Sequence, residues 1–225
     1  MTGFLEIVLI ILGVGLLGGL AWFAWKMEQK KREAFAAWAQ SHGWTYDWNQ
    51  NRDIAQRYAF LDRLQSGANR YAVHCLAGEW RGHPAEAFTF HFETYSHGKH
   101  GRTTHHHYFA VVLFHLEQSF PELCIHPEGL FAKFGQMLGF DDIDFESVEF
   151  SKAFSVRSED KKLAYDFCHT GMMEHLLQHP KTALELEGSV LALYDKRSLK
   201  PDDIEHRLDQ LHQVRTLIPD FLFRD

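Results

Sequence analysis

The sequence predicts an α+β protein: an N-terminal transmembrane helix followed by one domain built on an antiparallel sheet with flanking helices. Residues 7–25 carry no charge, residues 71–116 alternate as strands do, and helical spacing occurs on both sides of that stretch. A chain of 225 residues, 45% of them hydrophobic, can build a sizeable core. We therefore expect an anchor with a basic juxtamembrane collar at 1–32 and a single domain at 33–225.

The uncharged run at 7–25 is 19 residues long, and a helix of about 20 apolar residues spans a bilayer. Neither a preceding basic residue nor a cleavage site suggests a secretory signal. Four basic residues follow the run: Lys26, Lys30, Lys31 and Arg32. Because basic segments stay in the cytoplasm, we expect a single-pass protein of the cell inner membrane, with its N-terminus outside and its domain in the cytoplasm. The lipid bilayer is then the first expected partner.

Charge and cysteine content narrow the function classes. Residues 33–225 carry 19 basic and 28 acidic residues, a net charge of −9, and such an acidic domain argues against nucleic-acid binding. The three cysteines, Cys75, Cys124 and Cys168, contain no CxxC spacing. This pattern predicts neither a disulfide framework nor a zinc knuckle, and it fits a reducing compartment.

The first half of the domain should contain two helices and at least four strands. Residues 28–40 continue the first helix, which should end at Gly43, and residues 51–64 have the spacing of a second helix. Residues 43–48 alternate strictly and predict a strand.

A β-hairpin should follow, because residues 71–80 and 85–95 flank the turn-forming Arg-Gly-His-Pro at 81–84. We expect a polar loop at 96–104, and a central strand at 108–116, which is apolar on both faces. Phenylalanines recur with period two along the second strand of the hairpin, at Phe88, Phe90 and Phe92.

The second half alternates between short helices and strands. Strands are expected at 123–125, 148–157 and 184–194, and helices at 129–138, 158–167, 172–178 and 201–217. The region 184–194 should be a hairpin, because Gly188 can supply the positive φ of a two-residue turn. Ser158 should cap the helix that it begins.

The densest polar feature is a group of six of the sixteen histidines within 17 residues: His91, His97, His100, His105, His106 and His107. If the hairpin turn centres on Lys99, His91 faces His107 and Glu93 faces His105. Three histidines and one glutamate suit zinc. A slip of one residue would move this set to another face, and a solvated hairpin tip is the simpler interpretation. Zinc is thus the one possible cofactor.

Two other groups are weaker metal candidates. His175 and His179 have the i,i+4 spacing of paired ligands, but a histidine in the last helical turn is as well explained by the helix dipole. The acidic run at 141–149 lacks an EF-hand pattern and more simply forms the wet face of a strand. P-loop, GxGxxG, GxSxG and kinase signatures are missing, so we assign no catalytic residue.

Three segments resemble a known group in their order. They are Ser-His-Gly-Trp at 41–44, the run into the central strand at 99–112, and Val-Glu-Phe-Ser-Lys-Ala-Phe-Ser-Val at 148–156. With the N-terminal apolar helix, they resemble an uncharacterised bacterial family of single-pass membrane-anchored proteins with a cytoplasmic α+β domain. The resemblance covers most of the chain and implies no activity, because its motifs are structural.

The function these features favour is that of a membrane-anchored cytoplasmic binding or scaffold module, whose partner is another protein or a second copy of the chain. The alternative is a metal-binding hydrolase or sensor of zinc type that uses the histidine-rich hairpin. A third hypothesis is that a lipid or small ligand binds against the aromatic sheet. Whether the chain is an enzyme stays open.

Overall fold

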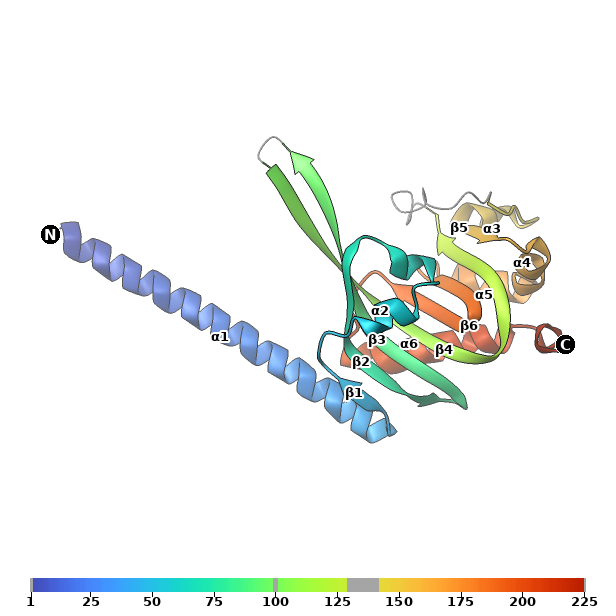
Figure 1. Cartoon of the computed structure of the whole chain (residues 1–225), viewed down its shortest axis with the longest axis horizontal. Coiled ribbons are helices and arrows are strands. Elements are labelled where there is room, and N and C mark those ends of the chain that lie inside the picture. Colours follow the sequence, from blue (N-terminus) through green and yellow to red (C-terminus); the bar gives the residue numbers. More distant parts are fainter. Residues whose placement is uncertain (1, 99–100, 129–141, 225) are drawn as a thin grey trace.

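The computed structural model describes residues 2–98, 101–128 and 142–224, with side chains from residue 13 onward (Figure 1). Within these residues a six-stranded antiparallel sheet has the order β1-β2-β3-β4-β5, and β6 pairs with the other edge of β4. The strands are β1 Thr45–Asp47, β2 Ala68–Trp80, β3 His83–Gly98, β4 Gly101–Pro127, β5 Phe154–Ser158 and β6 Ala183–Asp195. The expected antiparallel sheet with flanking helices is confirmed.

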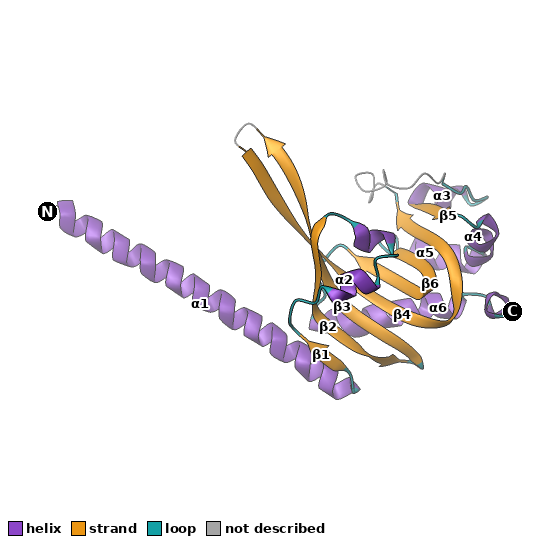
Figure 2. Cartoon of the chain, in the orientation of Figure 1, coloured by secondary structure: helices purple, strands orange, loops and turns teal. Residues whose placement is uncertain are grey.

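Helices cover both faces of this sheet (Figure 2). They are α1 Thr2–His42, α2 Asp53–Arg57, η1 Asp62–Gln65, α3 Val148–Ala153, α4 Lys161–Phe167, α5 Thr170–Gln178, η2 Pro201–Asp203, α6 Ile204–Leu217 and η3 Asp220–Phe223. One face packs against α2 and η1, and the expected row of Phe88, Phe90 and Phe92 is buried there. The other face packs against the C-terminal end of α1 and against α4, α5 and α6.

The expected transmembrane helix is contradicted. In the part of the chain that the structure describes, no helix is both long and apolar enough to cross a bilayer. The described apolar stretch of α1, residues 13–25, has 13 residues before the charges begin at Lys26, whereas a span needs about 20. Residues 7–12 of the expected span lie outside the described side chains. The single-pass topology and the inner-membrane localisation, which rested on that span, are not supported.

α1 extends far from the domain (Figure 1), and it runs without a break past residue 32 to its expected end beside Gly43. Large apolar side chains are exposed along its described projecting part: Val14, Leu16, Leu17, Leu20, Trp22, Phe23, Trp25 and Met27. Large apolar side chains exposed in such number are typical of surfaces that other molecules cover.

The C-terminal part of α1 is attached to the sheet through a buried histidine. The Phe35 ring stacks on His74 with centroids 4.7 Å apart, and Tyr46 Oη lies 2.8 Å from His74 Nδ1. His74 Nε2 lies 3.5 Å from a carboxylate oxygen of Glu28. Burial lowers the pKa of His74 to about 4, so the ring is neutral at neutral pH. These contacts hold the C-terminal part of α1 against the sheet.

The central hairpin is longer than expected. The strands expected at 71–80, 85–95 and 108–116 are confirmed, but residues 96–98 and 101–104, expected as loop, continue the ladder of β3 and β4. Pairing runs out to Gly98 opposite Gly101. Residues 99–100 lie outside the described part of the chain. The expected strand at 123–125 is the far end of β4 rather than a separate strand.

The hairpin expected at 184–194 is wrong: β6 is one strand that pairs with β4 along its length. Gly188 does have a positive φ of 56°. It lies opposite Phe120, where the register between the two strands shifts, so its backbone makes a local bend rather than a turn.

Three other local expectations differ from the structure. Residues 148–153 form α3, because the Ser147 side chain caps the helix by accepting the Phe150 N–H, and only 154–158 is strand. Asp160 rather than Ser158 caps α4. The helix expected at 51–64 is divided into α2 and η1, whereas α5 and α6 match the expected helices. The helix expected at 129–138 lies outside the described residues.

Candidate functional site

β3 and β4 extend beyond the rest of the sheet as a two-stranded ribbon (Figure 1). We define the distal ribbon as residues 94–98 and 101–106. Most of its side chains are exposed on both faces. The last residue of β3 that pairs with β2 is Glu93, and β6 first pairs with β4 at Ala110. In the described ladders, each strand of the distal ribbon therefore bonds only to the other, and both outer edges are open.

Polar side chains stabilise the distal ribbon across its two strands. On one face Ser96 Oγ lies 2.8 Å from His105 Nε2, and Thr94 Oγ1 lies 2.8 Å from His107 Nε2. On the other face the Arg102 guanidinium stacks 3.4 Å above the Tyr95 ring. These cross-strand pairs replace the apolar packing that holds the rest of the sheet.

Three potential metal ligands converge where the distal ribbon joins the sheet. His91, Glu93 and His106 each place a ligand atom within 4.8 Å of the others. His91 Nε2 lies 3.0 Å from His106 Nδ1, and the Glu93 carboxylate lies 3.6 Å from the same His106 nitrogen. His91 is fully buried between the rings of Tyr71 and Tyr108, at centroid distances of 4.2 and 4.7 Å. His106 is half exposed, so the group faces solvent on one side.

A β-bulge in the neighbouring strand orients this group. The register between β2 and β3 shifts between Ala68 and Tyr71, and Asn69 has a left-handed φ of 48°. The Asn69 carbonyl oxygen accepts a hydrogen bond from His91 Nδ1 at 3.1 Å. The Asn69 side-chain amide donates to Glu93 Oε1 at 2.6 Å. One bulged residue thus holds two of the three converging side chains.

The same hydrogen bonds set the protonation states. Because a carbonyl oxygen only accepts, His91 Nδ1 carries the proton and His91 Nε2 presents its lone pair to His106. Burial lowers the pKa of His91, so the ring is neutral at neutral pH. The hydrogen bonds from Asn69 and from the Tyr95 hydroxyl lower the pKa of Glu93, which is therefore a carboxylate. The group combines the neutral imidazole of His91, the carboxylate of Glu93 and the imidazole of His106.

The structure brings together only part of the expected metal set. His91 and Glu93 share one face, as expected, but Glu93 pairs with His106, and His105 and His107 lie on the opposite face. The pairing is centred half a residue beyond the expected centre at Lys99. The side chains of β4 therefore lie on the opposite faces from those expected. The two glycines at 98 and 101, which pair across the ladder, were the signal that could have placed it. Metal binding itself stays a prediction.

A second group of potential ligands, Asp62, Glu122 and Cys124, lies in the half-buried space beside η1. Burial, with the neighbouring Glu122 charge, raises the pKa of Asp62 to about 6. Burial also raises the pKa of the Cys124 thiol, so the sulfur is protonated at neutral pH. A protonated thiol is a poor ligand, and this group is the weaker candidate.

The His175 and His179 pair is explained by the helix end. His179 follows the last residue of α5, and its Nδ1 lies 2.9 Å from the His175 carbonyl oxygen. This local bond favours the structural interpretation of the pair over the metal one.

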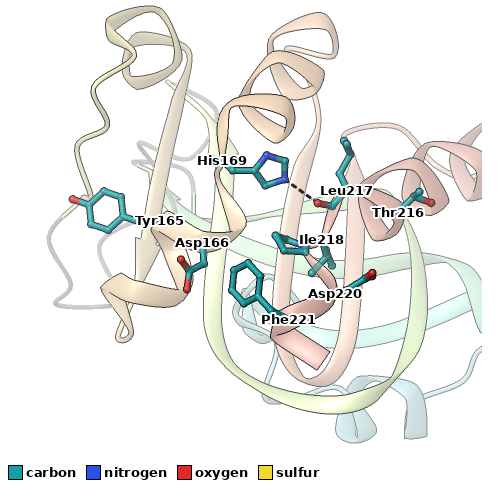
Figure 3. A pocket seen from close by; sticks show the side chains of 9 residues that line it. Tyr165, Asp166, His169, Thr216, Leu217, Ile218, Asp220 and Phe221 are labelled. Carbon is teal, nitrogen blue, oxygen red and sulfur yellow. Dashed lines mark hydrogen bonds between the residues drawn. The ribbon is translucent and has the colours of Figure 1, made fainter. Parts of the chain in front are cut away.

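An open pocket of about 600 Å³ lies between the α4–α5 junction and the segment from α6 to η3 (Figure 3). His169 points into it, but its Nε2 donates to the Leu217 carbonyl at 2.9 Å and its Nδ1 accepts the Gly171 N–H at 3.2 Å. Asp166 at the rim is paired with Lys162 at 2.8 Å. With both ring nitrogens and the carboxylate engaged, the pocket offers no ready acid, base or nucleophile from these groups.

Comparisons with known proteins show the fold. No protein-family model matches the chain, and no curated protein matches it. Among solved structures, the chain is similar to the crystal structure of the mycobacterial trehalose monomycolate transport factor A, TtfA. The TM-score is 0.55 at 13% sequence identity, and the match covers 84% of this chain and 95% of TtfA. At this identity the two share an architecture, and the family resemblance stated above stays a prediction.

Proposed function

We propose that the chain is a binding module that engages an acidic protein partner through the distal ribbon. The observation that carries this proposal is the ribbon's exposure on both faces and along both edges. Such a ribbon buries little apolar surface, so it adds little to the stability of the fold. Contacts outside the chain best explain why the strand pair extends beyond the sheet.

The chemistry of the distal ribbon suits protein recognition. Tyr95 and Arg102, stacked on each other and exposed, are residue types enriched at the energetic centres of interfaces. Residues 96–107 contain Lys99 and Arg102 and no acidic residue, although the whole chain has a net charge of −7. Charge complementarity therefore favours an acidic partner surface. The open backbone edges would let an extended partner segment add as a further strand.

Two further observations support binding over catalysis. Two polar groups that line the open pocket are already engaged, His169 by the backbone and Asp166 by Lys162. The similar solved structure bears the name of a transport factor. Both are consistent with a chain that acts by holding partners together.

Photocrosslinking in the cell of origin tests the proposal. A photoreactive amino acid replaces Tyr95 in the distal ribbon or, as a matched control, Tyr165 on α4, which is also exposed. We expect one discrete protein adduct from position 95 and none of the same mass from position 165. Arg102→Ala should reduce the adduct at least five-fold, because a central interface residue contributes about 1 kcal/mol or more. Arg197→Ala, which removes another exposed arginine, should leave it unchanged.

A second variant separates binding from folding. Residues 96–103 are replaced by Asn-Gly, so that Tyr95 and Thr104, which pair across the strands, flank a two-residue turn. The shortened chain should fold and lose the adduct. A full-strength adduct in this folded variant, or an adduct with nucleic acid instead of protein, would contradict the proposal.

A further inference from the structure

We infer that His91, Glu93 and His106 form a binding site for a divalent transition metal of the zinc type, where the distal ribbon joins the sheet. The inference goes beyond the proposed partner binding, because it concerns metal ligands at the base of the distal ribbon and its test needs no partner. Imidazole nitrogens with one carboxylate form a ligand set that zinc accepts in three-ligand sites.

The spacing of the ligand atoms is already close to what a tetrahedral ion needs. Zinc binds nitrogen and oxygen ligands at about 2.0–2.2 Å, so two ligand atoms in a tetrahedral site lie roughly 3.3–3.5 Å apart. The two imidazole nitrogens are 3.0 Å apart, and the Glu93 oxygen is 3.6 Å from His106 Nδ1. The third separation, between the ligand atoms of His91 and Glu93, is within 4.8 Å, so the side chains would need to close in slightly to seat the ion. Without metal, His106 Nδ1 donates to His91 Nε2; to coordinate through Nδ1, the ring takes the other tautomer, with its proton on Nε2.

The surroundings of the site provide the orientation that bound metals use. Metal-ligating histidines commonly donate their second ring N–H to a backbone carbonyl, which fixes the ring and its tautomer. His91 does this through Nδ1 to the Asn69 carbonyl, so Nε2 carries the lone pair that a metal would take. Glu93 is held in turn by the Asn69 amide and the Tyr95 hydroxyl. The bulge at Asn69 therefore holds both ligands of β3 before any ion binds.

The site leaves one side open. His91 is fully buried, but the side chain of His106 is 55% exposed, so an ion can enter from solvent beside it. A tetrahedral ion on three protein ligands keeps a fourth position for water or another ligand. Bound metal would also join β3 to β4 at the base of the distal ribbon, because Glu93 and His106 are directly paired across the ladder.

Cobalt binding to the tag-free full chain tests the inference, because tetrahedral Co²⁺ absorbs visible light and Zn²⁺ displaces it. We expect a saturable absorbance that Zn²⁺ removes. His106→Asn should weaken binding at this site by at least ten-fold and lower the stoichiometry by one at micromolar metal. Glu93→Gln, which removes the negative charge, should weaken binding in the same direction. Neither variant alters a side chain of the two buried apolar clusters, so both should fold.

Two further variants make the result specific. Asn69→Gly keeps the left-handed backbone and its carbonyl but removes the amide that holds Glu93, and it should weaken binding about 10–100-fold, as loss of an orienting group does. His105→Asn, on the opposite face of the same ribbon, should leave binding unchanged. Equal binding by wild type and His106→Asn, an equal loss in His105→Asn, or no tetrahedral absorbance in the folded wild type would overturn the inference.

Discussion

The two ends of the β3–β4 strand pair share one hydrogen-bond ladder but differ in how deeply their side chains are buried. Near the sheet centre, residues 85–92 of β3 and 109–114 of β4 are mostly buried on both faces, whereas the distal ribbon is exposed on both. The antiparallel ladder runs through both without a register shift. Because the backbone pairing is the same, burial of side chains separates a region that stabilises the fold from one that is free to bind.

The boundary between the two regions is sharp and polar. His91 is the last buried polar residue of β3 on its face. The next pair along the ladder on that face joins the half-buried Glu93 to the exposed His106. The bulge at Asn69 ends the contact of β2 with β3 at the same level. The candidate metal site thus occupies the point where the strand pair leaves the sheet.

The largest expected effect comes from the buried end. Phe90 is fully buried in the core cluster on the α2 and η1 face, with its ring 5.3 Å from that of Phe109, so Phe90→Ala should lower the free energy of unfolding by about 3–5 kcal/mol. Urea unfolding followed by circular dichroism measures it. The matched ribbon variant, Tyr95→Ala, should change the value by no more than about 0.5 kcal/mol. Similar losses of unfolding free energy in the two variants would contradict the claim that only the buried end of the strand pair stabilises the fold.

A buried carboxyl should make the stability of the core depend on pH. Glu185 is buried between Tyr194 and η1, where it accepts hydrogen bonds from the Asp62 and Arg63 N–H groups and the Tyr194 hydroxyl. Burial raises its pKa to about 8. In the unfolded chain the pKa is about 4.3, so the folded state holds the proton more tightly and stability falls as pH rises from about 4.3 to 8.

Glu185→Gln should therefore show a smaller loss of unfolding free energy between pH 6.5 and 8 than the wild type does. This window is chosen because His74 and His126, whose pKa values burial lowers to about 4, affect stability only below about pH 6.5. Glu79→Gln, at an exposed position, serves as the control. Parallel pH profiles for wild type and Glu185→Gln would show that the carboxyl is ionised in the fold.

The sequence was sufficient where a pattern reports local burial. The period of Phe88, Phe90 and Phe92 located β3 and its inward face, because alternation follows directly from strand geometry. The sequence was not sufficient where a strand pairs with a segment far away along the chain. Gly188 has the positive φ of a turn residue, but it lies within β6, where the pairing with β4 shifts near Phe120.

The candidate site was half predictable for the same reason. His91 and Glu93 share a face of β3 by alternation alone, so their pairing needed no structure. The position of His106 opposite Glu93 is set by the exact register of the hairpin, which the sequence did not fix. The contact of Asn69 with His91 depends on a bulge in a strand 22 residues away in the sequence. For the apolar run at 7–25, composition alone predicted a transmembrane helix. No described helix is long and apolar enough to be one.

The bulge at the boundary should show a modest and separable effect. Asn69→Gly and Asn69→Ala both remove the side-chain bonds to Glu93 and Arg52, but only alanine has a β-carbon that strains the left-handed backbone. Alanine should therefore cost about 1 kcal/mol more unfolding free energy than glycine. Equal unfolding free energies for the two variants would mean that the bulge is not held in this conformation.

The smallest expected effect is that of shortening the distal ribbon. Replacing residues 96–103 by Asn-Gly removes exposed side chains and keeps both apolar clusters intact. The free energy of unfolding should change by less than about 1 kcal/mol in either direction. A loss as large as that of Phe90→Ala would show that the distal ribbon is a structural part of the domain.

Amide hydrogen exchange of the full chain, read by mass spectrometry, tests the division of the strand pair most directly. The account predicts a step in protection near His91 and Tyr108: amides of residues 85–90 and 109–114 should exchange only through global unfolding, and those of the distal ribbon through local opening of much lower free energy. Uniform protection along both strands, from the sheet centre to Gly98 and Gly101, would contradict the division into a stabilising region and a binding region.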